Sequence, residues 1–286
     1  MVTAIAGLEE GIITPSTKIL DKGAYTYYPG TPPKCWIYRQ HGTTHGLVNV
    51  SEAIKVSCNY FFFDVGRRLG IDRLVDYATR FGLGEKTGIE LTERSGVMAS
   101  REYTESLGQK WYDGNTLSVA IGQENSAFTP SSWPTISPPW STGGTRYSAH
   151  LLKGGQIQRL LPGALHLRTG GAGLHRHPAG ESGCGESGDA GPDHREGALW
   201  PAISRTFLSR WGAKTGSAQV GSADKEADAV FTLFAPYDDP EIVISIVVEG
   251  GASGGNLAQA AGEIVNYYFS AEHTVESVDA ENTLLR

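Results

Sequence analysis

Two short polar runs in this sequence hold residue types that could do chemistry together. Lys214-Thr215-Gly216-Ser217 brings a cation and two hydroxyl groups into one stretch, and Ser57-Cys58-Asn59 brings a hydroxyl and an amide into another. Such groups can move protons and donate hydrogen bonds to a ligand. Alone, the lysine run is weak evidence, because lysine on an edge strand often prevents aggregation and a glycine there can mark a bulge.

The Ser57 run has an equally ordinary alternative. Ser57 and Asn59 are residue types that commonly cap the start of a helix, and a cap for a helix that begins near Asn59 would explain both. The functional interpretation is that a turn directs both side chains into a cleft. Residue types alone do not exclude either reading.

The Ser57 run must be positioned by helices. Asn49 or Ser51 can cap a helix, and from there to Leu83 the apolar residues recur at helical spacing, interrupted by Gly70. Upstream, residues 2–10 read as a helix that ends at Gly11. The proline-rich stretch from residue 25 to residue 45 predicts an irregular connection.

The lysine run must be positioned by strands. We predict strands over residues 214–220, 230–235 and 242–248, with the last two joined as an antiparallel hairpin by Asp238-Asp239-Pro240. A helix follows the glycine-rich residues 250–255 and carries an apolar face from Leu257 to Tyr268. Strands followed by a covering helix indicate an α+β architecture.

The stretch between these regions has an anomalous composition. No valine occurs from Ala120 to Gln219, and glycine and histidine are frequent after Gly154. Neither helical nor strand periodicity persists there, so residues 131–211 are predicted to be disordered or translated out of frame. Residues 271–286 are expected to form a C-terminal tail.

Composition excludes several classes of function. The chain has 286 residues, 40% of them hydrophobic, and a net charge of −7 without a basic block, which argues against nucleic acid as a partner. Cys35, Cys58 and Cys184 are widely spaced and read as incidental thiols, so neither a disulfide framework nor a zinc site is expected. His41 and His45 lack a third ligand pattern, and no metal site is predicted there either.

In combination, the motifs resemble those of one enzyme family. The chain is similar to the transpeptidase domain of a class B penicillin-binding protein of the elongation type, whose signatures run S-x-x-K, S-x-N and K-T-G in chain order. The similarity covers residues 1–129 and 212–270, and residues 143–153 also resemble the family. It rests on Gly11–Pro15, Ser51–Phe63, Gly82–Glu90, Ala120–Glu124, Thr129-Pro130 and Lys214–Ala218.

The resemblance implies a fold and a role for each motif residue. The fold would be a five-stranded antiparallel sheet flanked by helices, forming a single partial domain over residues 1–286. Ser57 would relay a proton to the leaving amine and Asn59 would hold the substrate amide. Lys214 would bind the substrate carboxylate with the hydroxyls of Thr215 and Ser217, Gly216 would let the substrate backbone lie along the strand, and the Ser217 N–H would form half of an oxyanion hole.

The resemblance also implies what surrounds the domain. The nucleophilic serine and its lysine would fall just before Met1, so this chain by itself is expected to be inactive. The substrates would be the D-Ala-D-Ala stem peptides of peptidoglycan, and β-lactams would be the inhibitors. The intact protein would work in a cell-wall elongation complex. No cofactor is implied. The intact protein would sit on the extracytoplasmic face of the cell membrane, with its anchor outside this chain.

Two alternatives remain. A β-lactam sensor domain shares the same signatures without being an enzyme, and an unrelated α+β binding protein could carry them by coincidence. The coding sequence upstream of Met1 would discriminate between them: an S-x-x-K motif behind a long ectodomain and one membrane span supports the transpeptidase, whereas several spans support the sensor.

Overall fold

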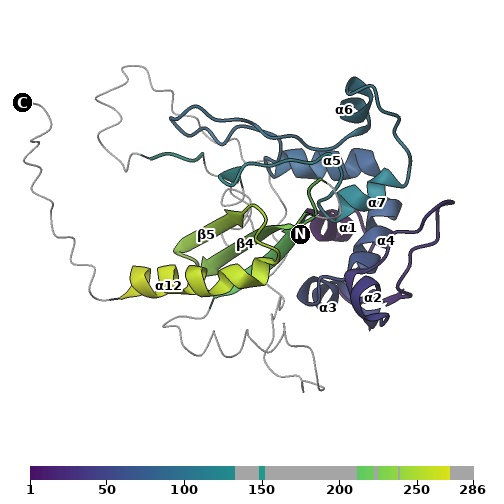
Figure 1. Cartoon of the computed structure of the whole chain (residues 1–286), viewed down its shortest axis with the longest axis horizontal. Helices are drawn as coiled ribbons and strands as arrows, with labels where there is room; N and C mark the ends of the chain where they lie inside the picture. The colour runs from purple at the N-terminus through teal and green to yellow at the C-terminus, as the bar shows by residue number, and fades with distance from the viewer. Residues whose placement is uncertain (133–147, 152–210, 222–224, 238, 271–286) are drawn as a thin grey trace, which may run out of the picture. The chain divides into compact units, whose positions relative to one another are not determined.

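The computed structural model describes residues 1–132, 148–151, 211–221, 225–237 and 239–270. The chain divides into two compact units, residues 1–189 and 190–286 (Figure 1). Most of the anomalous stretch at 131–211, and the predicted tail at 271–286, lie outside the described residues. No helix among the described residues is long and apolar enough to cross a membrane.

Short helices around one central helix make up the first unit. The central helix is α4, and its neighbours include α1, α5 and α7 (Figure 1). The elements of this unit, in chain order, are α1 (Val2–Glu9), β1 (Ile19–Asp21), α2 (Trp36–His41), β2 (Gly46–Val48), α3 (Val50–Lys55), α4 (Asn59–Leu69), α5 (Ile71–Arg80), α6 (Arg101–Ser106) and α7 (Asn115–Ala120).

The core of the first unit forms because α4 is apolar on several sides. Phe61 and Val65 are fully buried, and Leu74 of α5 packs with them in the same cluster. Gly66 lets α7 approach closely, since a Cβ there would overlap the Cβ of Ala120. The hydroxyl of Thr3 donates to the carbonyl oxygen of Ala120 at 2.6 Å, so α1 is also tied to α7.

Two helix starts in this unit, those of α3 and α6, have a side-chain cap. Asn49, one of the two caps that the sequence offers, caps α3 through a capping box with Glu52. Helix α2 lies within the stretch that the proline content predicted to be irregular. That prediction was wrong for residues 36–41, because the prolines all precede Trp36 and place no constraint on the chain after it.

The second unit is an antiparallel meander covered by one helix. Strands β3 (Gly212–Ala218), β4 (Asp228–Ala235) and β5 (Ile242–Val248) pair in the order β3-β4-β5 and are followed by a 3-10 helix, η1 (Gly254–Leu257), and α12 (Ala258–Phe269). Alternate residues of β4 are buried, and its buried residues Phe231 and Leu233 pack in one cluster with Ala261 and Val265 of α12. Burial with a period of two is the signature of a sheet with one covered face.

The observed strands confirm the α+β class and the predicted hairpin between β4 and β5. Within the described residues, however, the five strands divide into a three-stranded sheet and a separate two-stranded one. The strands β1 and β2 have three residues each and pair with each other in antiparallel register. Within the described residues, therefore, the single five-stranded sheet implied by the resemblance does not form.

Candidate functional site

Ser57 lies in a tight turn between α3 and α4. Its backbone has a φ of +52°, an uncommon conformation for any residue other than glycine. The Ser57 N–H donates to the Ile54 carbonyl oxygen at 3.3 Å, and the Cys58 N–H donates to Ala53 at 2.9 Å. A left-handed residue costs on the order of 1–3 kcal/mol and persists where its surroundings hold it, often at functional sites.

The turn bears on the helix-cap interpretation of the Ser57 run. The N-cap of α4 is Cys58, and no side chain caps this helix end by a hydrogen bond. Ser57 therefore stands outside the helix, and Asn59 is the first helical residue. Both side chains are half-buried and flank Cys58, which is fully buried. The capping interpretation is wrong.

In the second unit, the lysine run forms most of β3. Lys214 lies opposite Thr232 of β4 and Gly216 lies opposite Val230, in regular antiparallel register. The Lys214 ammonium donates to the Thr215 carbonyl oxygen at 2.8 Å. Burial lowers the pKa of Lys214 to about 8. A lysine that is partly stripped of water gains more from an incoming carboxylate than a hydrated one does.

The first residue of η1, Gly254, lies directly against this strand. A Cβ at Gly254 would come within 2.6 Å of the Gly216 carbonyl oxygen and would also overlap the Val230 carbonyl oxygen. The Gly254 N–H points to the Ser217 hydroxyl at 3.4 Å. Gly254 thus supports the middle of β3 from its own unit, a contact that the sequence analysis missed because glycine-rich loops carry no periodic signal.

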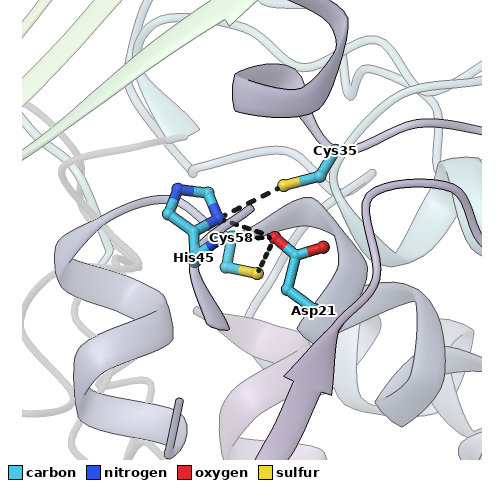
Figure 2. A group of neighbouring side chains, drawn as sticks. All are labelled: Asp21, Cys35, His45 and Cys58. Carbon is cyan, nitrogen blue, oxygen red and sulfur yellow. Dashed lines mark hydrogen bonds and ion pairs between the residues drawn. The ribbon is translucent and has the colours of Figure 1, made fainter. Parts of the chain in front are cut away.

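A second group of side chains gathers next to the Ser57 turn. Asp21 at the end of β1, Cys35 ahead of α2, His45 ahead of β2 and Cys58 each offer one ligand atom, and these atoms lie within 4.8 Å of one another (Figure 2). The His45 Nδ1 is 2.9 Å from Asp21 Oδ2 and 3.4 Å from Cys35 Sγ. The Cys58 thiol is 3.6 Å from Asp21 Oδ2.

This Asp21–Cys35–His45–Cys58 cluster is almost completely shielded from solvent. The side chains of His45 and Asp21 are 6% and 0% exposed, and both cysteines are buried. Burial opposes ionisation of Asp21, but hydrogen bonds from the Gly23 N–H and from His45 outweigh it, so the Asp21 pKa lies below its ordinary value. A hydrogen bond with Cys58 lowers the pKa of Cys35 and raises that of Cys58.

The geometry of the cluster fits a tetrahedral metal ion. Zinc binds sulfur at about 2.3 Å and nitrogen or oxygen at about 2.0–2.2 Å, which places neighbouring ligand atoms about 3.3–3.8 Å apart. The three contacts within the cluster, 2.9, 3.4 and 3.6 Å, are close to those separations. Thiolate and imidazole together are the donor set that suits zinc.

These contacts correct the interpretation of Cys35 and Cys58 as incidental thiols. His45 does have further potential ligands, although His41, at the end of α2, is exposed and takes no part. Sequence spacing could not show this, because the four residues come from four separate elements and form no C-x-x-C or H-x-x-x-H pattern. Only the β1-β2 pairing and the start of α4 bring them together.

With both motifs and their supports described, the chain can be compared with known proteins. Residues 1–160 match the family described as "Penicillin binding protein transpeptidase domain". The chain belongs to this family. Within it, the chain is 30% identical, over 93% of its length, to the peptidoglycan D,D-transpeptidase MrdA of Acinetobacter baumannii, and 28% identical, over 98%, to that of Escherichia coli. It spans 40% and 46% of those two relatives.

Solved penicillin-binding proteins share the fold. The Pseudomonas aeruginosa PBP2 crystallised with WCK 5153 gives a TM-score of 0.70 at 26% identity, over 95% of this chain and 60% of that one. The Helicobacter pylori PBP2 in complex with MreC gives a TM-score of 0.73 at 23% identity, over 94% and 48%. The predicted family and its fold are therefore confirmed.

Proposed function

We propose that this chain is part of a peptidoglycan D,D-transpeptidase, the activity after which its relatives are named. The observation that carries the proposal is the pair of motifs in family order, with half-buried Ser57 and Asn59 at the turn before α4 and Lys214 in a regular strand. Membership of the family supports the reaction class. The sensor alternative is disfavoured, because the relatives that cover most of the chain are named as transpeptidases.

The proposed reaction is acyl transfer through a serine ester. A serine hydroxyl attacks the carbonyl between two D-alanines, the terminal D-alanine leaves as an amine, and the amine of a second stem peptide then takes the acyl group. No S-x-x-K motif lies ahead of Ser57 within residues 1–286, where the family order would place the nucleophile. We therefore propose that this chain alone is not acylated.

Each motif residue has a proposed task in that reaction. Ser57 relays a proton to the departing amine, and Asn59 holds the substrate amide. The Lys214 ammonium, with the hydroxyls of Thr215 and Ser217, receives the terminal carboxylate. The Ser217 N–H stabilises the oxyanion, a donor worth about 3 kcal/mol of barrier. Gly216 keeps the strand open to the substrate backbone.

The setting of the enzyme is proposed by the same reasoning. The peptidoglycan substrate lies outside the cytoplasm, so the intact protein would work at the outer face of the cell membrane. The solved structure of the Helicobacter pylori PBP2 is that of a complex with MreC. We propose a comparable cell-wall elongation complex for the intact protein, and β-lactams as its inhibitors.

Labelling with a fluorescent penicillin tests the proposal. The chain as given should take no label, whereas a chain extended through its natural upstream coding sequence, with residues 131–211 restored to the family frame, should be labelled at the upstream serine. In that background, Lys214→Ala should slow labelling by about 10- to 150-fold, because the charged hydrogen bond is worth about 1.5–3 kcal/mol.

Lys225→Ala provides the matched control, since Lys225 is an exposed lysine of the same unit. Its labelling rate should stay within about twofold of the parent. Equal loss in both variants, or label mapped to Ser57 in the chain as given, would contradict the proposed roles.

A further inference from the structure

An exposed aromatic side chain of the first unit is held against other rings and a cation. Tyr27 lies in the connection between β1 and α2, and 62% of its surface is exposed. The Arg67 guanidinium of α4 covers its ring, with the guanidinium carbon 4.0 Å from the ring centroid. Tyr28 meets Tyr27 edge-on at 5.1 Å, and Tyr25 stacks beside it at 6.5 Å. We call these three tyrosines and Arg67 the Tyr27 platform.

Arg67 is fixed beneath the platform by a largely buried polar network. Its Nε donates to the Tyr25 hydroxyl at 2.7 Å, and its Nη2 is 3.4 Å from Asp64 Oδ1. The Tyr25 hydroxyl donates to the same Asp64 oxygen at 2.9 Å, and Arg68 pairs with the other one. Burial raises the pKa of Tyr25, so its hydroxyl keeps the proton that it donates. A ring that is fixed before binding loses little conformational entropy when a ligand stacks on it.

We propose that the Tyr27 platform binds the glycan strand of peptidoglycan, with the apolar face of one sugar ring stacked on Tyr27. This inference deepens the proposed function and rests on it, because the glycan belongs to the substrate proposed there. Binding of a sugar to the platform requires no acylation, so it can be measured separately from the reaction.

The charges around the platform favour an uncharged ligand. Because Arg67 already lies over the Tyr27 ring, a second cation would be repelled there. An anion gains little either, since Arg67 is paired with Asp64. Burial and the nearby Asp113 carboxylate both raise the pKa of Tyr28, which places a negative charge beside the platform. A pyranose ring is uncharged, offers a flat face of C–H groups to an aromatic ring, and carries hydroxyls that can bond to phenol groups.

The platform and the Ser57 run are connected through α4. Asn59 is the first residue of this helix, and Arg67 lies about two turns further on, about 12 Å along the axis at 1.5 Å per residue. Tyr60, directly after Asn59, meets the Tyr25 ring edge-on at 5.1 Å. An extended peptide spans about 3.3–3.6 Å per residue, so about four residues of a stem peptide cover the same distance. A glycan held on the platform would therefore let its stem peptide reach Asn59.

The first arm of the test measures retention of the whole chain by a sugar polymer. In native gels that contain glycol chitin, a soluble β-1,4-linked polymer of N-acetylglucosamine, the chain should migrate more slowly than in gels without it. Tyr27→Ala should weaken this binding by about tenfold, a loss within the range for removal of one stacking aromatic ring. Tyr27→Phe keeps the ring and should bind within about threefold of the parent, since it loses at most one hydrogen bond to the sugar.

Tyr267→Ala is the matched control for this arm. Tyr267 is a tyrosine of α12 that is 69% exposed and does not belong to the platform. Its removal should leave the retention unchanged. Equal weakening by Tyr27→Ala and Tyr267→Ala would overturn the inference, as would a Tyr27→Phe variant that binds as weakly as Tyr27→Ala.

The second arm observes binding to the unmodified chain, so a misfolded variant cannot imitate its result. The chain is labelled with ¹³C in its tyrosine rings and titrated with chitohexaose, and the NMR signals of Tyr27, Tyr28 and Tyr267 are assigned by their loss in the matching Tyr→Phe variants. The Tyr27 and Tyr28 signals should shift, and the Tyr267 signal should not. Equal shifts of all three signals, or no shift, would overturn the inference. Poly-L-glutamate should shift none of them, and a shift of Tyr27 by this polyanion but not by the sugar would overturn the choice of an uncharged ligand.

The result can be separated from that of penicillin labelling. Retention on glycol chitin that Tyr27→Ala leaves unchanged would overturn the glycan platform and would leave the transpeptidase proposal intact. A restored chain that takes no penicillin label would contradict the transpeptidase proposal, whereas Tyr27-dependent binding of the sugar would still establish the platform as a sugar site.

Discussion

The two motif regions reach their geometry by different means. Lys214–Ser217 form part of a seven-residue strand whose partner is the next strand in the chain, and every residue from Gly212 to Ala218 has a partner on β4. Ser57–Asn59 lie at an irregular turn and the start of α4, and the thiol of Cys58 in this run contacts Asp21 from another element. The strand is regular and pairs with a neighbour in the chain, whereas the turn has a left-handed residue and contacts a residue that is distant in sequence. Disturbing the supports of each region should therefore have different consequences.

Removing the Asp21 carboxylate, the hydrogen-bond acceptor of the buried cluster, should have the largest effect on the free energy of unfolding. Asp21→Ala leaves the Gly23 and His45 donors without their carboxylate, and breaking a buried, hydrogen-bonded charge of this kind costs about 3–5 kcal/mol. Urea unfolding followed by circular dichroism would measure the loss. Asp72→Ala, at an exposed position in the first turn of α5, is the matched control and should cost less than about 1 kcal/mol. Equal losses would show that the cluster is not a special support of the first unit.

A methyl group added at Gly254, which packs against β3, should have an intermediate effect on the stability of the second unit. Gly254→Ala would force its Cβ against the backbone of Gly216, at a cost of about 1–3 kcal/mol to the second unit. At Gly255 the nearest atom is the Ser253 hydroxyl at 3.5 Å, so Gly255→Ala should be tolerated. Hydrogen exchange of the β3 segment would report both changes. If the two variants change the hydrogen exchange of β3 equally, the close packing of Gly254 on β3 does not stabilise that strand.

Relieving the backbone of the turn should produce a smaller change of opposite sign. Ser57→Gly removes the Cβ that makes a φ of +52° unfavourable and should stabilise the first unit by up to about 1 kcal/mol. Ser57→Ala keeps the Cβ and should show no such gain. Chemical denaturation of the two variants side by side would measure the difference, and a glycine variant less stable than the alanine variant would contradict the assigned strain.

The smallest effect concerns the charge of Lys214. Because its pKa falls to about 8, Lys214 should react with an amine acetylating reagent with a midpoint near pH 8, well below that of ordinary lysines. The sign follows from the titration: below pH 8 the ammonium is present to bind a carboxylate, and above it the charge is lost. Peptide mass spectrometry after timed labelling would check this, with Lys225 as the internal reference. A shared midpoint for both lysines would show that Lys214 is fully hydrated.

The sequence predicts the helices and strands that form from local patterns, and it does not predict contacts between residues that are distant in the chain. The strands β3, β4 and β5 and the helix α12 follow from alternation, turn residues and an apolar face, and the structure confirms them. The Asn49 cap was also predictable, since its partner is Glu52. The left-handed Ser57 and the cluster around Asp21 were not, because they depend on which elements pack together. No short spacing encodes that packing.

The close approach of α4 and α7 has a consequence for tolerance of substitutions. Ala120 meets Gly66 of α4 on one side, and its carbonyl oxygen accepts the Thr3 hydroxyl of α1 on the other. A single methyl group added at Gly66 would displace α7 and, through the Thr3 hydrogen bond, also displace α1. Because Asn59 is the first residue of α4, its position depends on the same packing. Misplacement of a catalytic group by about 1 Å can cost on the order of 100-fold in rate, so under the proposed function the spacing of these helices would set the position of Asn59. Under the same proposal, substitutions at Gly66 or Ala120 would change the reaction rate without any contact with the substrate.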